Sequence, residues 1–240
     1  MTALEHAQFM RFDDRRDAAR RLAEKLHFYK GQQPLVLAIP RGGVPLASHL
    51  AQALEGDLDL ILVRKLCAPG DTEFALGAVD ENGRVYLTAE TRFMANPGYV
   101  ATEKIAQMAL MRKYRALYTP CRAASPITGR VVIVVDDGLA TGATMIAALR
   151  AVRADNPARL ICAVPVASPE ALRKVVSVAD DVVCLYAPSR FYAVGQFYED
   201  FSQVSDDEVI ALLQQAGNPP FPRFRPPEVS HENAGHPTVR

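Results

Sequence analysis

Short hydrophobic runs alternate along this chain with longer segments whose apolar residues recur at helical spacing. Branched aliphatic residues dominate the runs, which is typical of strands buried on both faces of a parallel sheet. The predicted strands are Leu35–Ile39, Leu58–Val63, Val131–Val135, Leu160–Ala167 and Asp181–Ala187. The predicted helices are Asp13–Phe28, Val44–Leu54, Pro97–Tyr118, a helix that follows Val135 and runs to about Arg153, Pro169–Val176 and Ser205–Gln215.

This alternation predicts an α/β fold with a doubly wound, mainly parallel sheet in three Rossmann-like layers. In such folds, ligands bind in the crevice at the carboxyl ends of the strands. One local departure is Asn82-Gly83, which predicts a hairpin turn between two short strands. Residues 217–240 are rich in proline and polar residues, so we expect a disordered tail.

Composition narrows the possible partners and the compartment. Lys plus Arg equals Asp plus Glu, at 27 each, so no overall field attracts nucleic acid or an anionic membrane. No apolar run approaches the roughly 18 residues that span a bilayer, and the first residues lack the apolar core of a secretory leader. The four cysteines form no CxxC pair and the five histidines are scattered, which argues against structural zinc and predicts a reducing cytoplasm.

The segment Val131–Thr144, VVIVVDDGLATGAT, carries the strongest chemical signal. Asp136 and Asp137 follow a buried strand, where two adjacent carboxylates repel each other unless a cation or hydrogen-bond donors accompany them. A ribose diol with Mg²⁺ would supply both, although the two acids could also simply cap the strand. The small residues that follow let backbone N–H groups close around a phosphate at a helix N-terminus. The segment matches neither GxxxxGK[ST] nor GxGxxG.

Two short basic segments also follow predicted strands. Pro40–Gly43, PRGG, follows the first strand, and its glycines expose N–H groups beside the positive charge of Arg41. Arg64 and Lys65 follow the second predicted strand. Both segments place positive charge at strand ends, where the ligand crevice is expected. A glycine-rich turn with a solvated arginine and a solvated basic pair are the alternatives.

VVIVVDDGLATGAT resembles the phosphoribosyl-diphosphate (PRPP) binding signature of the type I phosphoribosyltransferases. The resemblance implies that Asp136 and Asp137 bind the ribose 2′- and 3′-hydroxyls, with any contact to Mg²⁺ made indirectly through those hydroxyls or water. The residues implied to cradle the 5′-phosphate are Gly138, Leu139, Ala140, Thr141, Gly142, Ala143 and Thr144.

The same resemblance extends in element order from about Leu35 to Tyr198. PRGG looks like the family's pyrophosphate loop, formed by Arg41, Gly42 and Gly43. The family also has a basic residue where Lys65 stands, with Arg64 beside it, so both are implied to bind substrate. The residues implied to be catalytic are Asp136, Asp137, Lys65 and Arg41. The layout, including ALGAVDENG and FYAVGQFYEDF, is also similar to a group of bacterial predicted phosphoribosyltransferases of unknown acceptor.

One departure bears on the acceptor. Members that use hypoxanthine or guanine carry an Asp before TG that acts as a base toward the purine, and Ala140 stands there in this chain. An oxopurine acceptor is therefore disfavoured, and the loop supplies no general base. The resemblance implies that a small hood covers the acceptor. We expect one domain at residues 1–216, with a core at about 30–190 and the hood or C-terminal segment at about 190–216.

The function predicted from these elements is transfer of 5-phosphoribosyl from PRPP to a nitrogen acceptor, such as a nucleobase in salvage, with release of pyrophosphate. A lid is expected at residues 67–81, from which Glu73 could act, although a surface acid is the simpler interpretation. The aromatic segment of residues 191–198 could stack on a heterocycle or anchor the last helix. Residues 97–118 could belong to the hood, form a homodimer contact or be a solvated basic face.

Two other functions stay open at this point. The same fold could form a regulator that binds PRPP or a nucleotide with little or no catalysis. An unrelated α/β sugar-phosphate binder would not bind PRPP at all.

Overall fold

A five-stranded parallel sheet forms the centre of the computed structural model, which describes residues 11–87, 91, 96–120 and 123–216, without the side chains of residues 72 and 73. The strand order is β2-β1-β6-β7-β8. The bounds are β1 at Leu35–Ala38, β2 at Asp57–Leu60, β6 at Val131–Val135, β7 at Arg159–Val166 and β8 at Asp181–Tyr186. All four pairings are parallel, so the strands end at one common edge. The tail predicted at 217–240 lies outside the described residues.

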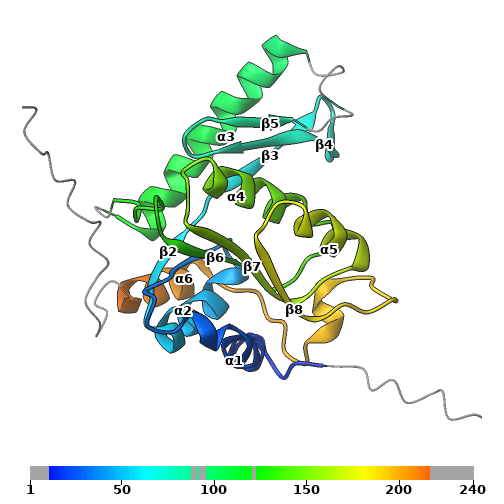
Figure 1. Cartoon of the computed structure of the whole chain (residues 1–240). Helices are drawn as coiled ribbons and strands as arrows, with labels where there is room; N and C mark the ends of the chain where they lie inside the picture. The colour runs from blue at the N-terminus through cyan, green and yellow to red at the C-terminus, as the bar shows by residue number, and fades with distance from the viewer. Residues whose placement is uncertain (1–10, 88–90, 92–95, 121–122, 217–240) are drawn as a thin grey trace, which may run out of the picture.

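Helices cover both faces of this sheet, which confirms the three-layer α/β prediction (Figure 1). On one face lie α1 (Arg15–Leu26), α2 (Gly43–Leu54) and α6 (Asp206–Ala216). On the other lie α4 (Ala143–Arg153) and α5 (Pro169–Val176). Two hydrophobic clusters result, because alternate residues of β6 point to opposite faces. Ile133 belongs to the α1–α2 cluster, and Val132 and Val134 belong to the α4–α5 cluster.

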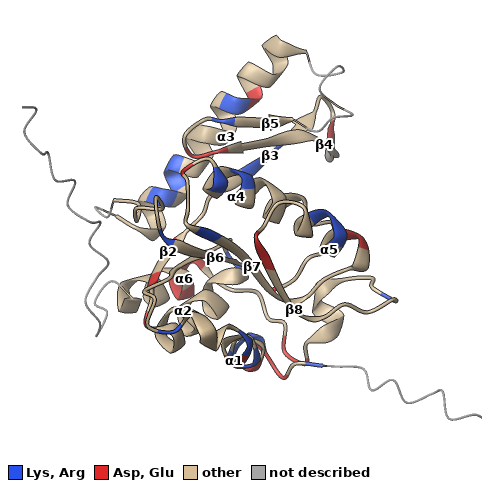
Figure 2. Cartoon of the chain, viewed as in Figure 1, with Lys and Arg blue, Asp and Glu red and all other residues tan. Residues whose placement is uncertain are grey.

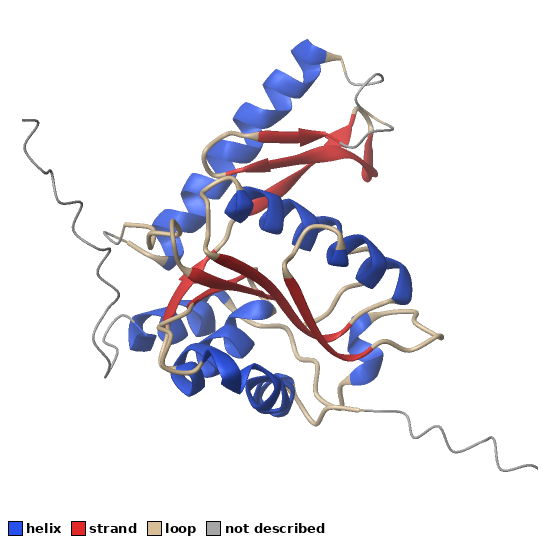
Figure 3. Ribbon diagram, in the orientation of Figure 1, coloured by secondary structure: helices blue, strands red, loops and turns tan. Residues whose placement is uncertain are grey.

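A second, smaller unit packs against α4, outside that face of the parallel sheet (Figure 3). It consists of an antiparallel sheet in the order β3-β4-β5 and the long helix α3 (Pro97–Tyr118). The strands are β3 at Val63–Ala68, β4 at Asp71–Asp80 and β5 at Val85–Leu87. The Asn82-Gly83 turn joins β4 to β5 as predicted, with Gly83 at φ +78°. The register of β3 against β4 shifts at Leu66/Cys67 and again at Cys67/Ala68.

The prediction of a single strand at Leu58–Val63 is wrong. β2 ends at Leu60, the chain leaves the parallel sheet at Ile61 and Leu62, and β3 begins at Val63 in the other sheet. Ile61 and Leu62 are both buried, so hydrophobicity does not change where the chain passes from one sheet to the other. Arg64 and Lys65 therefore lie within an antiparallel strand, and not at the carboxyl end of a parallel one.

Buried polar contacts join the two units. Arg115 of α3 donates to Glu81 at 2.8 Å through Nε and to Asp59 of β2 at 3.0 Å through Nη1. Its Nη2 donates to the carbonyl of Leu60 at 3.0 Å. Only 2% of the Asp59 side chain is exposed. The cation thus neutralises two acids at the point where the chain changes sheets.

Candidate functional site

The loops that follow β1 and β6 pack directly against each other. The N–H of Ile39 donates to the carbonyl of Val135 at 2.9 Å. A Cβ at Gly42 would lie 2.0 Å from Oδ2 of Asp137, and one at Gly43 would lie 2.5 Å from the carbonyl oxygen of Val135. Both positions therefore require glycine for close approach. The Pro40–Arg41 peptide bond in the first of these loops is cis.

The small-residue loop after the acidic pair is fixed to the end of β7. Leu139 donates its N–H to Val166, and Ser168 donates its hydroxyl to the carbonyl of Ala140 at 2.7 Å. Gly142 has φ +76°, and Ala143 begins α4. Thr141 and Ala143 are exposed. The loop therefore presents the N-terminus of an eleven-residue helix at the sheet edge, which is a suitable place for a phosphate.

The two neighbouring aspartates differ in their partners. Oδ1 of Asp136 accepts from the N–H of Asp137 at 2.9 Å. Oδ2 of Asp137 accepts two bonds from Arg15, from Nε at 3.0 Å and from Nη2 at 2.8 Å. Burial and the neighbouring charge of Asp137 raise the pKa of Asp136 well above its usual range. Burial also raises the pKa of Asp137, although Arg15 opposes that shift.

Arg15 and Tyr198 are two neighbours of Asp137 that the sequence did not indicate. The hydroxyl of Tyr198 donates to the carbonyl of Asp137 at 2.6 Å, and burial raises the pKa of that hydroxyl. In the sequence, Arg15 is one of several arginines on an amphipathic helix. Its distinguishing signal is its position at the first helical residue, directly after the N-cap Asp14.

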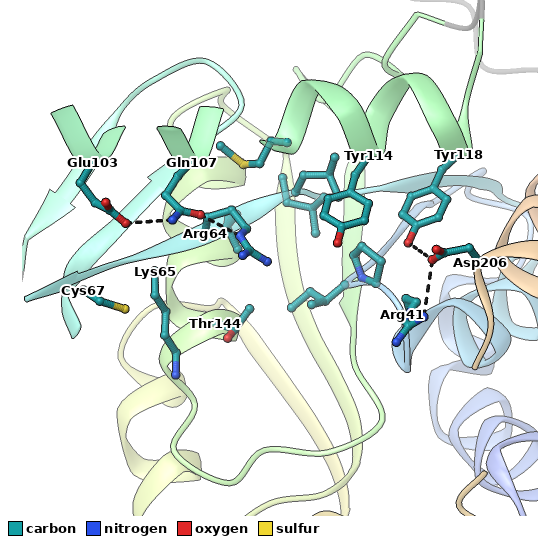
Figure 4. A pocket seen from close by; sticks show the side chains of 16 residues that line it. Arg41, Arg64, Lys65, Cys67, Glu103, Gln107, Tyr114, Tyr118, Thr144 and Asp206 are labelled. Atoms are coloured by element: carbon teal, nitrogen blue, oxygen red, sulfur yellow. Dashed lines mark hydrogen bonds and ion pairs between the residues drawn. The ribbon is translucent and has the colours of Figure 1, made fainter. Parts of the chain in front are cut away.

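A cavity of about 650 Å³ lies between the two units, beside these loops (Figure 4). Among the predicted site residues, Arg41, Arg64, Lys65 and Thr144 line it, and they come from three separate elements. The Lys65 side chain extends toward Thr144 at the start of α4 (Figure 4). The structure thus brings the two basic elements and one residue of the phosphate loop, Thr144, to this cavity, whereas Asp136 and Asp137 are not among the residues that line it. The sequence did not predict that Arg64 and Lys65 reach the cavity from an antiparallel strand.

Helix α3 forms the opposite wall of this cavity, and Asp206 of α6 closes one end (Figure 4). Arg64 donates from Nε to Gln107 of α3 at 3.0 Å. Tyr118 donates its hydroxyl to Asp206 at 2.6 Å, and Arg41 lies 3.6 Å from the same carboxylate. Arg41 is therefore already near an acid, which an incoming anion would have to displace.

A second cavity, of about 600 Å³, lies between the antiparallel sheet, α4 and α5. The predicted site residues that line it are Arg64, Lys65, Thr141, Ala143 and Thr144. Three of them, Arg64, Lys65 and Thr144, also line the first cavity. Figure 2 shows Lys and Arg positions on α3, β3 and α4 and elsewhere in both units, with Asp and Glu positions among them.

For the aromatic segment, the structure favours anchoring over ligand stacking. Phe197 and Tyr198 are each 1% exposed, and both belong to the core cluster. The ring of Tyr198 packs against Phe12 at 5.4 Å between centroids. Tyr192, in contrast, is 85% exposed. The lid predicted at residues 67–81 contains the whole of β4, and the Glu73 side chain lies outside the described residues.

The residues that the structure describes contain no group of three or more His, Cys, Asp or Glu side chains placed to hold a metal ion. The Asp136–Asp137 pair could still supply carboxylate oxygens, which Mg²⁺ prefers, if a bound substrate or water provides the other ligands. Within the described ranges, the helices are too short or too polar to cross a membrane.

Comparison with known proteins agrees with this geometry. Residues 11–202 match the family model described as "Phosphoribosyl transferase domain". A Mycobacterium tuberculosis protein provisionally named as a phosphoribosyl transferase is 40% identical over 207 residues, which cover 85% of this chain and 47% of that protein. This chain thus spans about half the length of the curated relatives it matches.

A solved structure, TT1426 from Thermus thermophilus, superimposes with a TM-score of 0.79 at 46% identity. The match covers 86% of this chain and 99% of that one. The family match thus extends over both units described above, from α1 to the segment that follows Tyr198. The chain belongs to the phosphoribosyl transferase domain family.

Proposed function

We propose that this protein is a PRPP-dependent phosphoribosyltransferase, a pentosyltransferase that joins 5-phosphoribosyl to a nitrogen acceptor and releases pyrophosphate. The observation that carries the proposal is the meeting of three elements at one sheet edge. These are the acidic pair after β6, the phosphate loop that begins α4, and the PRGG loop packed against Asp137 through Gly42. Membership of the family gives the arrangement its chemical interpretation.

In the proposed complex, each element binds one part of PRPP. Residues 138–144 bind the 5′-phosphate through backbone N–H groups and the hydroxyls of Thr141 and Thr144. Asp136 and Asp137 accept hydrogen bonds from the ribose hydroxyls. Arg41, Gly42 and Gly43 bind the pyrophosphate, with Arg64 and Lys65 reaching it from β3. Positioning and charge supply most of the rate in such a site.

The reaction exchanges one bond at the anomeric carbon. The carbon–oxygen bond to pyrophosphate breaks and leaves its electron pair on the departing oxygen, and a nitrogen of the acceptor forms the new bond to carbon. Arg41 and Lys65 stabilise the charge that develops on the leaving group. The acceptor nitrogen loses its proton to solvent or to the departing pyrophosphate, because Ala140 offers no base in the loop.

Mg²⁺ is the proposed cofactor, and Asp136 and Asp137 would hold it indirectly through the ribose hydroxyls or water. When bound, it would neutralise part of the charge of the diphosphate. We further propose a small nitrogenous base as the acceptor, a role in nucleotide salvage, a cytoplasmic location and a homodimer. The proposed domain is residues 1–216, and α3 takes part in the hood because it lines the 650 Å³ cavity.

The test is pyrophosphate release from PRPP and Mg²⁺ with a panel of nucleobases, with the mass of each nucleotide product measured. Turnover with one base supports the proposal and names the acceptor. Binding of PRPP by calorimetry without turnover on any base would favour the alternative, a regulatory protein of the same fold. Failure to bind PRPP at all would contradict both and favour a different sugar phosphate.

A further inference from the structure

Two segments that are far apart in the sequence meet behind the acidic pair. Residues 12–15 and 197–202, which we call the terminal clasp, are joined by backbone hydrogen bonds. Phe12 donates to Phe197 at 2.8 Å, Glu199 donates to Phe12 at 2.8 Å, and Asp200 donates to Asp13 at 2.9 Å. Phe12 is fully buried and Tyr198 is 1% exposed, so the clasp is part of the core rather than a loose terminus.

From this clasp, two side chains contact Asp137 at different atoms. Arg15 donates twice to carboxylate atom Oδ2, and the Tyr198 hydroxyl donates to the backbone carbonyl. Arg15 is itself fixed on two further sides. Its Nη1 donates to the carbonyl of Ser202 at 2.7 Å, and its guanidinium lies 4.1 Å from the centre of the Phe201 ring. The Arg15 and Asp137 side chains are only 13% and 15% exposed.

As a result, the two carboxylate oxygens of Asp137 have different surroundings. Both bonds from Arg15 converge on Oδ2, the oxygen that also lies against Gly42. Within the described part of the chain, no side chain donates a hydrogen bond to Oδ1 of Asp137, whereas Oδ1 of Asp136 accepts from the backbone N–H of Asp137. A guanidinium that is bonded on three sides holds a carboxylate in one rotamer more firmly than a lysine could, because its N–H groups are fixed in a plane.

We propose that Arg15 and Tyr198 are positioning residues for the pentose of PRPP, and that they orient Asp137 so that its Oδ1 atom accepts from a ribose hydroxyl. The N-terminal helix and the segment after β8 thereby complete a site whose substrate contacts lie on the loops after β1 and β6. This inference rests on the proposed function, because it concerns the same ligand. It assigns no direct contact with substrate to Arg15 or Tyr198.

The experiment compares PRPP binding in the presence of Mg²⁺ by calorimetry, and KM and kcat where an acceptor is known, for the full chain and four variants. Arg15→Gln should weaken PRPP binding about tenfold or more, the effect of losing one buried charge-assisted pair. Arg15→Lys should retain the charge and recover only part of the affinity. Tyr198→Phe, which keeps the buried ring, should weaken binding a few-fold. Arg16→Gln alters an exposed arginine on the same helix and should bind as the unaltered protein does.

A second measurement separates positioning from a purely structural role. Added guanidinium at millimolar concentration should restore part of the PRPP affinity of Arg15→Ala, since it can refill the space beside Asp137. KM for PRPP should rise more than kcat falls in Arg15→Lys and Tyr198→Phe. Circular dichroism and the unfolding midpoint identify any variant that fails to fold.

The outcomes distinguish this inference from the proposed function. If the unaltered protein does not bind PRPP, the proposed function is wrong. If it binds PRPP and the folded Arg15→Lys and Tyr198→Phe variants bind equally well, Arg15 and Tyr198 are structural only and the inference is overturned. The same holds if Arg15→Ala loses affinity only in proportion to its unfolded fraction.

Discussion

The parallel-sheet unit and the antiparallel unit that stands over it are built differently. All four residues of β1 are buried, as are four of the five in β6. The loops that follow these strands pack closely against each other at Gly42 and Gly43. In β3, Arg64 and Lys65 are exposed, and only Leu66 is buried. The first unit therefore holds its proposed ligand groups rigidly, whereas the second presents long cations at a surface. We therefore expect the affinity for PRPP to depend mainly on the first unit, and the rate at which pyrophosphate departs to depend mainly on the second.

The largest effect should come from the acidic pair of the parallel unit. Asp136→Asn with Asp137→Asn should weaken PRPP binding by about 1,000-fold, or about 4 kcal/mol, because the acceptors for the ribose diol become poorer. Calorimetry in the presence of Mg²⁺ measures this change, and circular dichroism checks that the fold is kept. Affinity within threefold of the unaltered protein would remove the pair from the pentose site.

The next effect should appear at the joint between the units. Arg115→Gln removes a cation that bonds both the buried Asp59 and the nearby Glu81, which should cost about 3 kcal/mol in the free energy of unfolding. Arg112→Gln, an exposed change on the same helix, should cost less than about 0.5 kcal/mol. Urea unfolding gives both values, and hydrogen exchange should show α3 and β4 loosened before β6. Uniform loosening would mean that the two units do not act separately.

A smaller cost is expected where the two loops touch. Gly42→Ala has a permitted backbone angle but would bring its Cβ to 2.0 Å from Asp137, so the carboxylate or the loop must move, at about 2 kcal/mol. Gly70→Ala, in the turn between β3 and β4, meets no atom within 4 Å and should cost about 1 kcal/mol, through its φ of +76° alone. Unfolding midpoints compare the two. Equal costs would show that the contact at Gly42 relaxes freely.

Lys65→Ala tests the role proposed for the antiparallel unit. Loss of a cation beside the leaving group should lower kcat about tenfold, or about 1.4 kcal/mol, with KM for PRPP changed less than twofold. Lys113→Ala, an exposed substitution on α3, is the matched control. An unchanged kcat would exclude Lys65 from the reaction. A change in KM alone would mean that Lys65 helps to bind PRPP but does not stabilise the transition state further.

The smallest effect concerns pH. Burial and Asp137 raise the pKa of Asp136 in the folded protein, so the folded state holds this proton more tightly than the unfolded chain does. Stability from this group is present at low pH and is lost as pH rises from about 4 through the raised pKa. Asp136→Asn should therefore be more stable than the unaltered protein at pH 8, and the gap should narrow at pH 5. Urea unfolding at both values tests this, and a constant gap would contradict it.

The same contrast explains what the sequence could and could not predict. Residues 131–135 are continuous and apolar because both faces of β6 are buried, so their strand and the acidic pair after it could be located directly. The run at 58–63 is also apolar apart from Asp59, yet it crosses from one sheet to another. Ile61 and Leu62 are buried at the crossing, so no polar residue marks it. Hydrophobicity predicts that a residue is buried, but it does not predict which sheet the residue joins.

The contacts of the acidic pair were also beyond the sequence. Arg15 lies 122 positions from Asp137, and Tyr198 lies 61 positions away, so no local spacing relates them. Each residue also has an ordinary structural explanation. An arginine on an amphipathic helix is commonly solvated, and an aromatic ring commonly belongs to a core. Their roles depend on tertiary packing that brings α1 and the segment after β8 to one loop.

The register of β3 fixes the direction in which each of its two cations projects. Consecutive side chains of a strand project to opposite sides, and Arg64 bonds to α3 while Lys65 extends toward α4 (Figure 4). The two register shifts, on either side of Cys67, oppose sliding of this strand past β4. Both cations line both cavities, so what depends on the register is the element that each one faces. A single residue inserted before Arg64 would therefore turn Lys65 toward α3 and Arg64 toward α4 and leave the composition of the strand almost unaltered.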